Sequence, residues 1–168
     1  MYLPDHDVTL EPLRPDHADA VLAFERDNRQ YFASWIWDRG DEFFTDYATR
    51  YAALLAEQEA GVCRFHVLVD NTGAVVGRVN LMDLENGSAE LGYRIAEKWA
   101  GKGLATAAVR AVIEVARTEY GLTALTAGAS NHNGASQAVL TRTGFRAVGS
   151  SSTDLGPGMK YELSLETA

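Results

Sequence analysis

The sequence predicts an α/β fold in which helices flank one mixed, mostly antiparallel β-sheet. Three strand-like segments follow one another with only short polar turns between them, which is typical of an antiparallel meander. The last of these strands, Ser88–Ile95, is joined to the next one, Leu122–Ala129, by a long amphipathic helix. Such a crossover makes the two strands parallel. A parallel pair inside an antiparallel sheet is a natural place for a splayed crevice.

The first 60 residues predict one strand, two helices and an irregular aromatic segment. Val8–Leu13 reads as a short strand. Asp16 is expected to cap a helix over His17–Arg29, whose apolar residues recur at helical spacing. Asp41–Gln58 predicts a second helix by the same spacing, and the segment Tyr31–Gly40 before it is aromatic and irregular.

The middle of the chain predicts the meander and the crossover helix. A helix over Leu104–Tyr120 carries an apolar stripe, and Gly121 is expected to end it as a C-cap. The strands before it are Arg64–Val69, Ala74–Asp83 and Ser88–Ile95, with turns at Asn71–Gly73 and Glu85–Gly87.

The remaining segments alternate strand and helix. After the strand Leu122–Ala129, a helix over Asn133–Thr143 is expected to end at Gly144. Two more strands complete the sheet, and the loop before the last one contains glycines at positions 156 and 158. These strands are Phe145–Ser150 and Lys160–Leu165.

Length and composition favour one folded domain over residues 1–168, located in the cytoplasm. Fifteen Lys and Arg residues against 23 Asp and Glu give a formal net charge of −8, which disfavours nucleic-acid binding. This charge is compatible with a cationic amine substrate or simply with solubility. We expect no membrane span, no signal peptide and, with Cys63 as the single cysteine, no internal disulfide.

The run Ala100–Thr106 is the most informative motif, because it places Gly101 and Gly103 between a strand and a helix. Glycines allow a tight turn and close approach to a ligand, and the free N–H groups of the helix point back at that turn. Together they suit a phosphate or pyrophosphate. The spacing fits neither a P-loop nor a dinucleotide fingerprint, which needs glycine where Thr106 stands. Alone, the turn could also lack any ligand.

A second segment, Asn131–Phe145, contains an Asn, a helix start with Ser, and a hydrophobic helix that ends in Gly-Phe. Ala100–Ala105 and this segment resemble, in the same order, the two signatures of the GNAT acetyltransferases. Tyr31–Trp35 and Gly92–Tyr93 further resemble the RimJ/RimL-like branch, which acetylates the N-termini of ribosomal proteins. The resemblance covers nearly the whole chain. It implies the GNAT fold, in which the two parallel strands diverge and the pantetheine arm of acetyl-CoA fills the gap.

The resemblance also implies which residues bind acetyl-CoA. Gly103 and Ala105 take the small-residue positions of the pyrophosphate signature, while Ala100 replaces the usual Gln or Arg. Backbone N–H groups at positions 93–95 are implied as donors to the thioester carbonyl and the pantetheine amides. The implied set is Tyr93, Arg94, Ile95, Ala100, Gly101, Lys102, Gly103, Leu104, Ala105, Thr106, Asn133 and Ser136.

Acetyl transfer to an amine needs a base and benefits from an acid near the leaving thiolate. Glu90 is the first candidate for the base, since a partly buried carboxylate can have a raised pKa; a structural or solvent-facing Glu is the alternative. His66 and Asp83 are weaker candidates. Ser136 is the candidate donor to the sulfur, or it makes only a helix N-terminal hydrogen bond. Leu140 stands where many GNAT enzymes have Tyr.

By resemblance, the aromatic segment lines the acceptor side of the cleft. Trp35 and Trp37, with Asp38 and Asp41, could receive a cationic amine, or the rings could form a satellite core. The predicted acceptor-binding residues are Tyr31, Trp35, Trp37, Asn80 and Glu90.

The predicted function is acetyl-CoA-dependent N-acetylation of a primary amine by direct transfer in a ternary complex. A protein N-terminus is the favoured acceptor by resemblance, and a small molecule such as a polyamine, an aminoglycoside or an amino acid derivative is the alternative. A CoA-binding sensor without catalysis is a third possibility, motivated by Ala100 and Leu140. A homodimer is expected from family habit, and the four scattered histidines predict no metal site.

Overall fold

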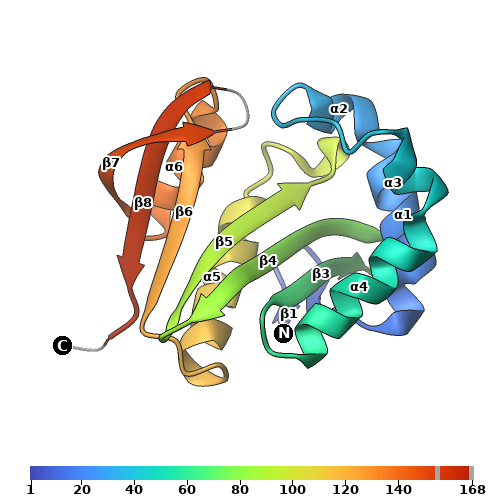
Figure 1. The fold of residues 1–168 in the computed structure, drawn as a ribbon, viewed down its shortest axis with the longest axis horizontal. Coiled ribbons are helices and arrows are strands. Elements are labelled where there is room, and N and C mark those ends of the chain that lie inside the picture. Colours follow the sequence, from blue (N-terminus) through green and yellow to red (C-terminus); the bar gives the residue numbers. More distant parts are fainter. Residues whose placement is uncertain (154–155, 167–168) are drawn as a thin grey trace.

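An eight-stranded mixed sheet runs through the computed structural model, which describes residues 1–153 and 156–166 (Figure 1). The strands are β1 (Tyr2–Leu3), β2 (Val8–Pro12), β3 (Arg64–Asp70), β4 (Val75–Glu85), β5 (Ser88–Ile95), β6 (Ala124–Ser130), β7 (Arg146–Thr153) and β8 (Gly156–Ser164). Their order in space is β1-β2-β3-β4-β5-β6-β8-β7. Of the neighbouring pairs, β5 and β6 are parallel and the others antiparallel, so the predicted sheet is confirmed.

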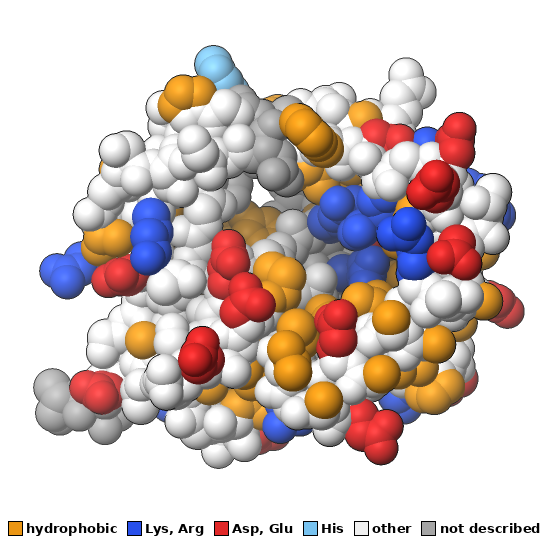
Figure 2. All heavy atoms as spheres, viewed as in Figure 1, with side chains coloured by type: hydrophobic (Ala, Val, Ile, Leu, Met, Phe, Trp, Pro, Cys, Tyr) orange, Lys and Arg blue, Asp and Glu red, His pale blue; other side chains and the backbone are white. Residues whose placement is uncertain are grey.

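The parallel strands β5 and β6 pair only at their beginnings and then part. Their register runs from Ser88 opposite Ala124 to Glu90 opposite Thr126. Beyond this point β5 stays paired with β4, and β6 stays paired with β8, so each strand keeps its outer partner. Figure 1 shows the two strands diverging, and Figure 2 shows the surface hollowed at the same place.

The helices cover both faces of the sheet. They are η1 (Pro15–His17), α1 (Ala18–Asp27), α2 (Arg29–Ala33), α3 (Asp41–Thr45), α4 (Tyr47–Glu59), η2 (Glu97–Trp99), α5 (Leu104–Thr118) and α6 (Gly134–Arg142). One hydrophobic cluster joins α5 and α6 to the sheet, and a second joins α1, α2 and α4 to the opposite face. Among the described residues, no helix has the length and apolarity needed to cross a membrane.

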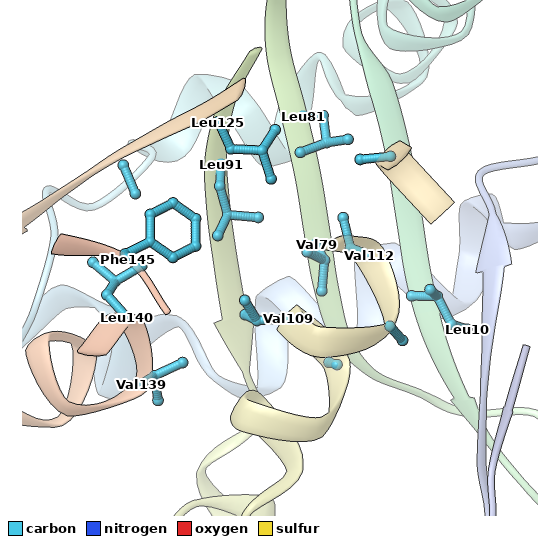
Figure 3. Packing of buried hydrophobic residues seen from close by; sticks show 14 of the residues in the cluster. Leu10, Val79, Leu81, Leu91, Val109, Val112, Leu125, Val139, Leu140 and Phe145 are labelled. Atoms are coloured by element: carbon cyan, nitrogen blue, oxygen red, sulfur yellow. The ribbon is translucent and has the colours of Figure 1, made fainter. Parts of the chain in front are cut away.

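Strand alternation separates the two clusters. The neighbours Val67 and Leu68 on β3 are both buried, but Val67 belongs to the second cluster and Leu68 to the first. Figure 3 shows the first cluster, with Val109 and Val112 of α5 pointing toward Val79 of β4. Adjacent side chains on a central strand therefore pack against helices on opposite faces.

Two helix predictions in the N-terminal part are wrong in detail. Asp16 does not cap α1, because it lies inside the 3₁₀ turn η1 and α1 follows directly at Ala18. The single helix predicted over Asp41–Gln58 is divided at Asp46 into α3 and α4. The Phe43 and Tyr47 rings meet edge to face at 5.7 Å across the break, as residues four apart also do on a continuous helix, so the apolar spacing does not reveal the division.

Two strand boundaries also differ from the predictions. The two-residue strand β1 was missed, being too short to show alternation. The segment expected as a loop before the last strand is already part of β8, which starts at Gly156. A Cβ at Gly158 would clash with the Ala129 carbonyl oxygen, so this glycine permits close contact between strands instead of forming a turn.

A buried histidine ties β3 to β4 and to the segment after α5. The His66 Nδ1 lies 3.1 Å from the Val79 carbonyl oxygen, which requires Nδ1 to donate. Nε2 then accepts a hydrogen bond of 2.6 Å from the Tyr120 hydroxyl. Burial lowers the pKa of His66 to about 4, so the ring is neutral at pH 7. This placement contradicts the alternative role of His66 as a base.

His66 should make the protein less stable in acid. The pKa in the folded state is below the ordinary 6.5, so the unfolded state binds the proton first as pH falls. This stabilisation of the folded state is complete above pH 6.5 and decreases as pH falls toward 4. By pH 4 the free energy of unfolding has lost about 3 kcal/mol from this group. Urea unfolding of wild type and His66→Gln at pH 7, 5.5 and 4 measures it.

The variant should show a flatter dependence of unfolding free energy on pH than wild type. Gln keeps one donor and one acceptor for Val79 and Tyr120, and His132→Gln at an exposed position is the matched control. Parallel curves for wild type and His66→Gln would contradict the assignment.

Candidate active site

A cleft of about 430 Å³ opens where β5 and β6 part. Its walls come from α2, the end of β5, the turn before α5, the first turn of α5, and α6. The structure brings most of the predicted site residues together here. Those that line the cleft are Tyr31, Trp35, Tyr93, Arg94, Ile95, Ala100, Gly101, Gly103, Leu104, Ala105, Thr106, Asn133 and Ser136.

The glycine turn has the conformation that its sequence predicts. Gly101 and Gly103 have φ of 72° and 80°, in the left-handed region that favours glycine. Gly103 is the N-cap of α5, and no described side chain caps this helix end. The first N–H groups of α5 have no intrahelical partners, and the residues from 104 to 106 that carry them line the cleft. The helix therefore presents free donors to an anion.

Lys102 does not line the cleft, in contrast to the prediction for the whole run. Its ammonium nitrogen lies 5.8 Å from the centroid of the Trp99 ring, where a cation–π contact holds it. The carbonyl of Lys102 accepts a hydrogen bond of 2.7 Å from Nε2 of His6. The turn between β1 and β2 thereby supports the glycine turn, although 96 residues separate the two groups.

The amide directions along β5 follow from its pairing with β4. The N–H of Ala96 donates to the Val76 carbonyl at 2.9 Å. Because amides alternate between the two edges of a strand, the N–H of Arg94 also points toward β4. The N–H groups of Tyr93 and Ile95 point toward the edge that β6 has left. Two of the three amides predicted as donors therefore face the cleft.

A hydrogen bond joins the two walls of the cleft. The Tyr93 hydroxyl on β5 and the Ser136 hydroxyl on α6 lie 3.1 Å apart. Asn133 is the N-cap of α6, and its side chain accepts from the Ser136 N–H at 3.1 Å. The predicted N-terminal hydrogen bond of Ser136 is thus made by its backbone, which leaves its hydroxyl free to meet Tyr93.

Burial raises the pKa of Tyr93 above 10, so its phenol stays protonated at neutral pH and can donate. Leu140, which stands where many GNAT enzymes have Tyr, is buried in the first cluster beside Phe145 (Figure 3). A phenol from a different element therefore stands close to Ser136. The sequence analysis considered only the backbone of Tyr93.

Glu90 and Asn80 lie outside the cleft lining. The side chain of Glu90 is exposed, so the expected partial burial of this carboxylate is wrong. It lies on the sheet face opposite α5, in register with Thr126 and, across β6, with Glu162. Asn80 lies opposite Gly92, and its buried Oδ1 has no hydrogen-bond partner among the described residues. Their roles as base and acceptor ligand stay predictions.

The aromatic segment divides between the cleft and a smaller cavity beside it. Tyr31 and Trp35 line the cleft, as predicted. Trp37 lines the smaller cavity and is 72% exposed, so it does not belong to a packed satellite core. Phe32 lines both cavities, and its buried ring meets that of Phe24 edge to face in the second cluster, with 5.3 Å between the ring centroids.

A buried carboxylate on α1 organises the smaller cavity. Glu25 is 1% exposed, and its two oxygens accept hydrogen bonds from Arg39, Arg78 and Arg94 at 2.8 to 3.0 Å. Burial alone would raise the pKa of Glu25, but these guanidinium groups lower it, so the carboxylate is charged. Arg29 pairs separately with Asp38 and Asp41. This cluster could not be predicted from the sequence, because its members are scattered along the chain.

The cleft also contains residues that the sequence analysis did not select. On α6, positions 135, 138, 139 and 142 form one helical face, of which helical spacing from Ser136 indicates only Val139. The residues outside α6 lie next to selected residues in the sequence. The full set is Phe32, Ile36, Trp99, Ala135, Ala138, Val139 and Arg142.

Comparison with known proteins identifies the family. A model of the acetyltransferase (GNAT) domain matches residues 7–146. The chain belongs to the GNAT acetyltransferase family. A Bacillus subtilis (strain 168) protein named "Putative ribosomal N-acetyltransferase YdaF" is 31% identical over 168 residues, which are 93% of this chain and 87% of the relative.

Solved GNAT structures show the same fold with different acceptors. The ribosomal-protein-S5-alanine acetyltransferase from Vibrio fischeri has a TM-score of 0.88 at 19% identity, covering 95% of this chain and 94% of that one. The spermidine N-acetyltransferase from Vibrio cholerae, in complex with CoA and spermine, has a TM-score of 0.80 at 17% identity, covering 95% and 96%. At these identities the likeness concerns the fold alone.

As a GNAT acetyltransferase, the chain is an enzyme that uses acetyl-CoA as its acyl donor. The residues present fit that group. The free N–H groups at the start of α5 suit a pyrophosphate, and the two β5 amides that face the cleft suit an amide-containing arm. Ala100 offers no side-chain donor, so anion binding depends on the backbone.

Gly103→Val should weaken acetyl-CoA binding without unfolding the protein. A Cβ at Gly103 would meet only His6 Nε2, at an ordinary 3.8 Å, so strain comes from the φ of 80° and not from a clash. A β-branched residue disfavours this conformation and moves the first N–H groups of α5. We expect a loss of roughly tenfold or more in affinity by calorimetric titration with acetyl-CoA.

Gly121→Val is the matched control. Gly121 has a φ of 64° and open space around it, but it follows the far end of α5. This variant should bear similar backbone strain and keep wild-type affinity. Equal affinities of wild type and Gly103→Val would contradict the position assigned to the anion site.

Proposed function

We propose that this enzyme transfers the acetyl group of acetyl-CoA directly to the α-amine of a protein N-terminus. The hydrogen-bonded pair of Tyr93 and Ser136 carries the catalytic part of the proposal, because it sets two hydroxyl groups in the cleft next to the anion-binding turn. The similarity to YdaF, at 31% identity, supports the choice of acceptor.

Residues of both walls would act on the reacting groups. Acetyl-CoA supplies an acetyl thioester. The N–H groups of Tyr93 and Ile95 point into the cleft and can stabilise the developing oxyanion. The hydroxyl pair of Tyr93 and Ser136 can donate to the departing thiolate. Burial raises the pKa of the Cys63 thiol and the residue lies outside the cleft, in keeping with transfer that forms no acyl-enzyme.

The amine must lose a proton before or during attack. Glu90 is the carboxylate proposed to accept it, through water, since its exposed side chain lies near the point where β5 and β6 part. Asn80 is proposed to accept a hydrogen bond from the acceptor with its buried Oδ1, which has no partner within residues 1–153 and 156–166.

A small cationic amine is the second candidate acceptor. The exposed carboxylates of Glu90 and Glu162 lie in register on one face of the sheet, both opposite Thr126, and together can attract a polyamine. A homodimer stays a prediction from the family resemblance, and cytoplasmic location stays a prediction from composition.

An acceptor assay distinguishes these proposals. Thiol release from acetyl-CoA, with mass spectrometry of the product, is measured for peptides with free and blocked N-termini and for spermidine. We expect acetylation of free peptide N-termini and none of blocked peptides. Faster turnover of spermidine would favour the small-molecule function, and acetyl-CoA binding without transfer to any amine would favour a non-catalytic module.

Tyr93→Phe should slow the chemical step while leaving donor binding intact. Loss of the phenol removes the partner of Ser136 and one donor to the leaving sulfur. We expect kcat to fall roughly 10- to 100-fold, with affinity for acetyl-CoA within about threefold of wild type. Steady-state kinetics and titration measure the two effects.

Tyr47→Phe removes a half-buried phenol that donates to the Ala18 carbonyl outside the cleft, and it serves as the control. Its kcat should equal that of wild type. An unchanged kcat in Tyr93→Phe would exclude the phenol from the chemical step.

A further inference from the structure

The ion cluster around Glu25 carries more positive charge than its carboxylate can neutralise. Three guanidinium groups, from Arg39, Arg78 and Arg94, surround one carboxylate, which leaves two positive charges in excess. The neighbouring Arg29 is bound by both Asp38 and Asp41, which carry one negative charge more than it does, so one positive charge in excess remains over the two groups together. Figure 2 shows Lys and Arg side chains gathered on one side of the hollow. Uncompensated positive charge at a concave surface favours an anionic ligand.

Glu25 has no further capacity to accept hydrogen bonds. Oε1 accepts from Arg39 and Arg78, and Oε2 accepts from Arg39 and Arg94, so each oxygen has two donors. Among the described residues, the single hydrogen bond of the Arg94 side chain is the one to Glu25. A guanidinium has five N–H donors, so Arg94 keeps several for a ligand.

Among the three arginines that bind Glu25, Arg94 is the one that lines the main cleft. It lines both the main cleft and the smaller cavity, whereas Arg78 lines neither and is buried. Its guanidinium carbon lies 5.0 Å from the centroid of the Phe32 ring, which fixes its plane. Burial lowers the pKa of Arg94 to about 10, and the group is still charged at neutral pH. Tyr93, the next residue, carries the hydroxyl that meets Ser136.

We propose that Arg94, held by Glu25 and assisted by Arg39, binds a carboxylate of the acceptor, so that preferred acceptors are protein N-termini with Asp or Glu among their first residues. This inference rests on the proposed transfer to an N-terminal amine and names the substrate class of that site. Planar guanidinium groups bind carboxylates with two parallel hydrogen bonds, which gives orientation as well as attraction.

The two sides of the hollow carry opposite charges. The carboxylates of Glu90 and Glu162 lie on the same face of the sheet as Arg94, nearer the start of β5. An acceptor with an amine at one end and a carboxylate further along matches this polarity. A polyamine carries positive charge along its whole length and would bring a cation against Arg94.

The test compares three peptides that differ only at their second and third residues, both Glu, both Gln or both Lys, each with a C-terminal amide. Free serine and serine amide are added, because a carboxylate can also come from the main chain of a free amino acid. The kcat/KM of each acceptor is measured with saturating acetyl-CoA for wild type, Arg94→Gln, Arg94→Lys and Arg78→Gln.

Wild type should prefer the Glu peptide over the Gln peptide by roughly tenfold or more, with the Lys peptide slowest. In Arg94→Gln this preference should fall to about twofold or less, and Arg94→Lys should recover part of it. Arg78→Gln removes a buried partner of the same carboxylate and should lower the melting temperature while keeping the preference. A larger preference for free serine over its amide would assign the subsite to a main-chain carboxylate and overturn the N-terminal acidic peptide.

Equal use of the Glu and Gln peptides by wild type, or a preference that survives in Arg94→Gln, would overturn the inference while leaving the N-acetyltransferase proposal intact. Failure to acetylate any peptide would instead contradict the proposed function. In that case the CoA-loaded protein is titrated with the Glu and Gln peptides. If wild type binds the Glu peptide more tightly than the Gln peptide, and Arg94→Gln does not, the carboxylate site is supported even without turnover. Equal affinities of wild type for the two peptides would overturn it.

Discussion

The short pairing between β5 and β6 is the constraint on which the rest of the structure depends. A strand edge without a partner exposes polar backbone groups, which need water or a ligand. Here the outer edges of both strands remain paired with β4 and β8, so only the edges facing the cleft are free. The same divergence exposes the N–H groups of Tyr93 and Ile95 and opens the space toward which α5 directs its N-terminus. The divergence of β5 and β6 thus makes N–H donors accessible both to an amide-containing arm and to an anion.

The Glu25 cluster sets the electrostatics of the other side of the cleft. It links α1 to β4 through Arg78, to β5 through Arg94 and to the loop before α3 through Arg39. Buried charges are stable only when paired and hydrogen-bonded, so the positions of these elements are coupled. Because Glu25 holds one corner of the Arg94 guanidinium, that group presents its remaining donors in a fixed direction.

The sequence was sufficient for the parts of the molecule that local conformation determines. The turn at Gly101 and Gly103 was predictable because positive φ and a free helix end follow from residue type and order. The parallel pair was predictable because a helix joins its strands. By contrast, the contact of Tyr93 with Ser136 spans 43 residues, and the bonds of Glu25 to Arg78 and Arg94 span 53 and 69. A periodic pattern of residues cannot indicate contacts between residues so far apart in the sequence. The division at Asp46 and the exposure of Glu90 likewise depend on packing between elements.

The cleft passes between the strands from one face of the sheet to the other, and this has a consequence for the kinetic order of the reaction. Its lining includes α5 and α6, which cover one face, and α2, which covers the opposite face. In the proposed transfer, the two reactants would enter from opposite sides and meet at the hydroxyl pair between them. Neither needs to pass the other, so steric exclusion imposes no obligatory order of addition, and each product can depart by the side from which its parent arrived.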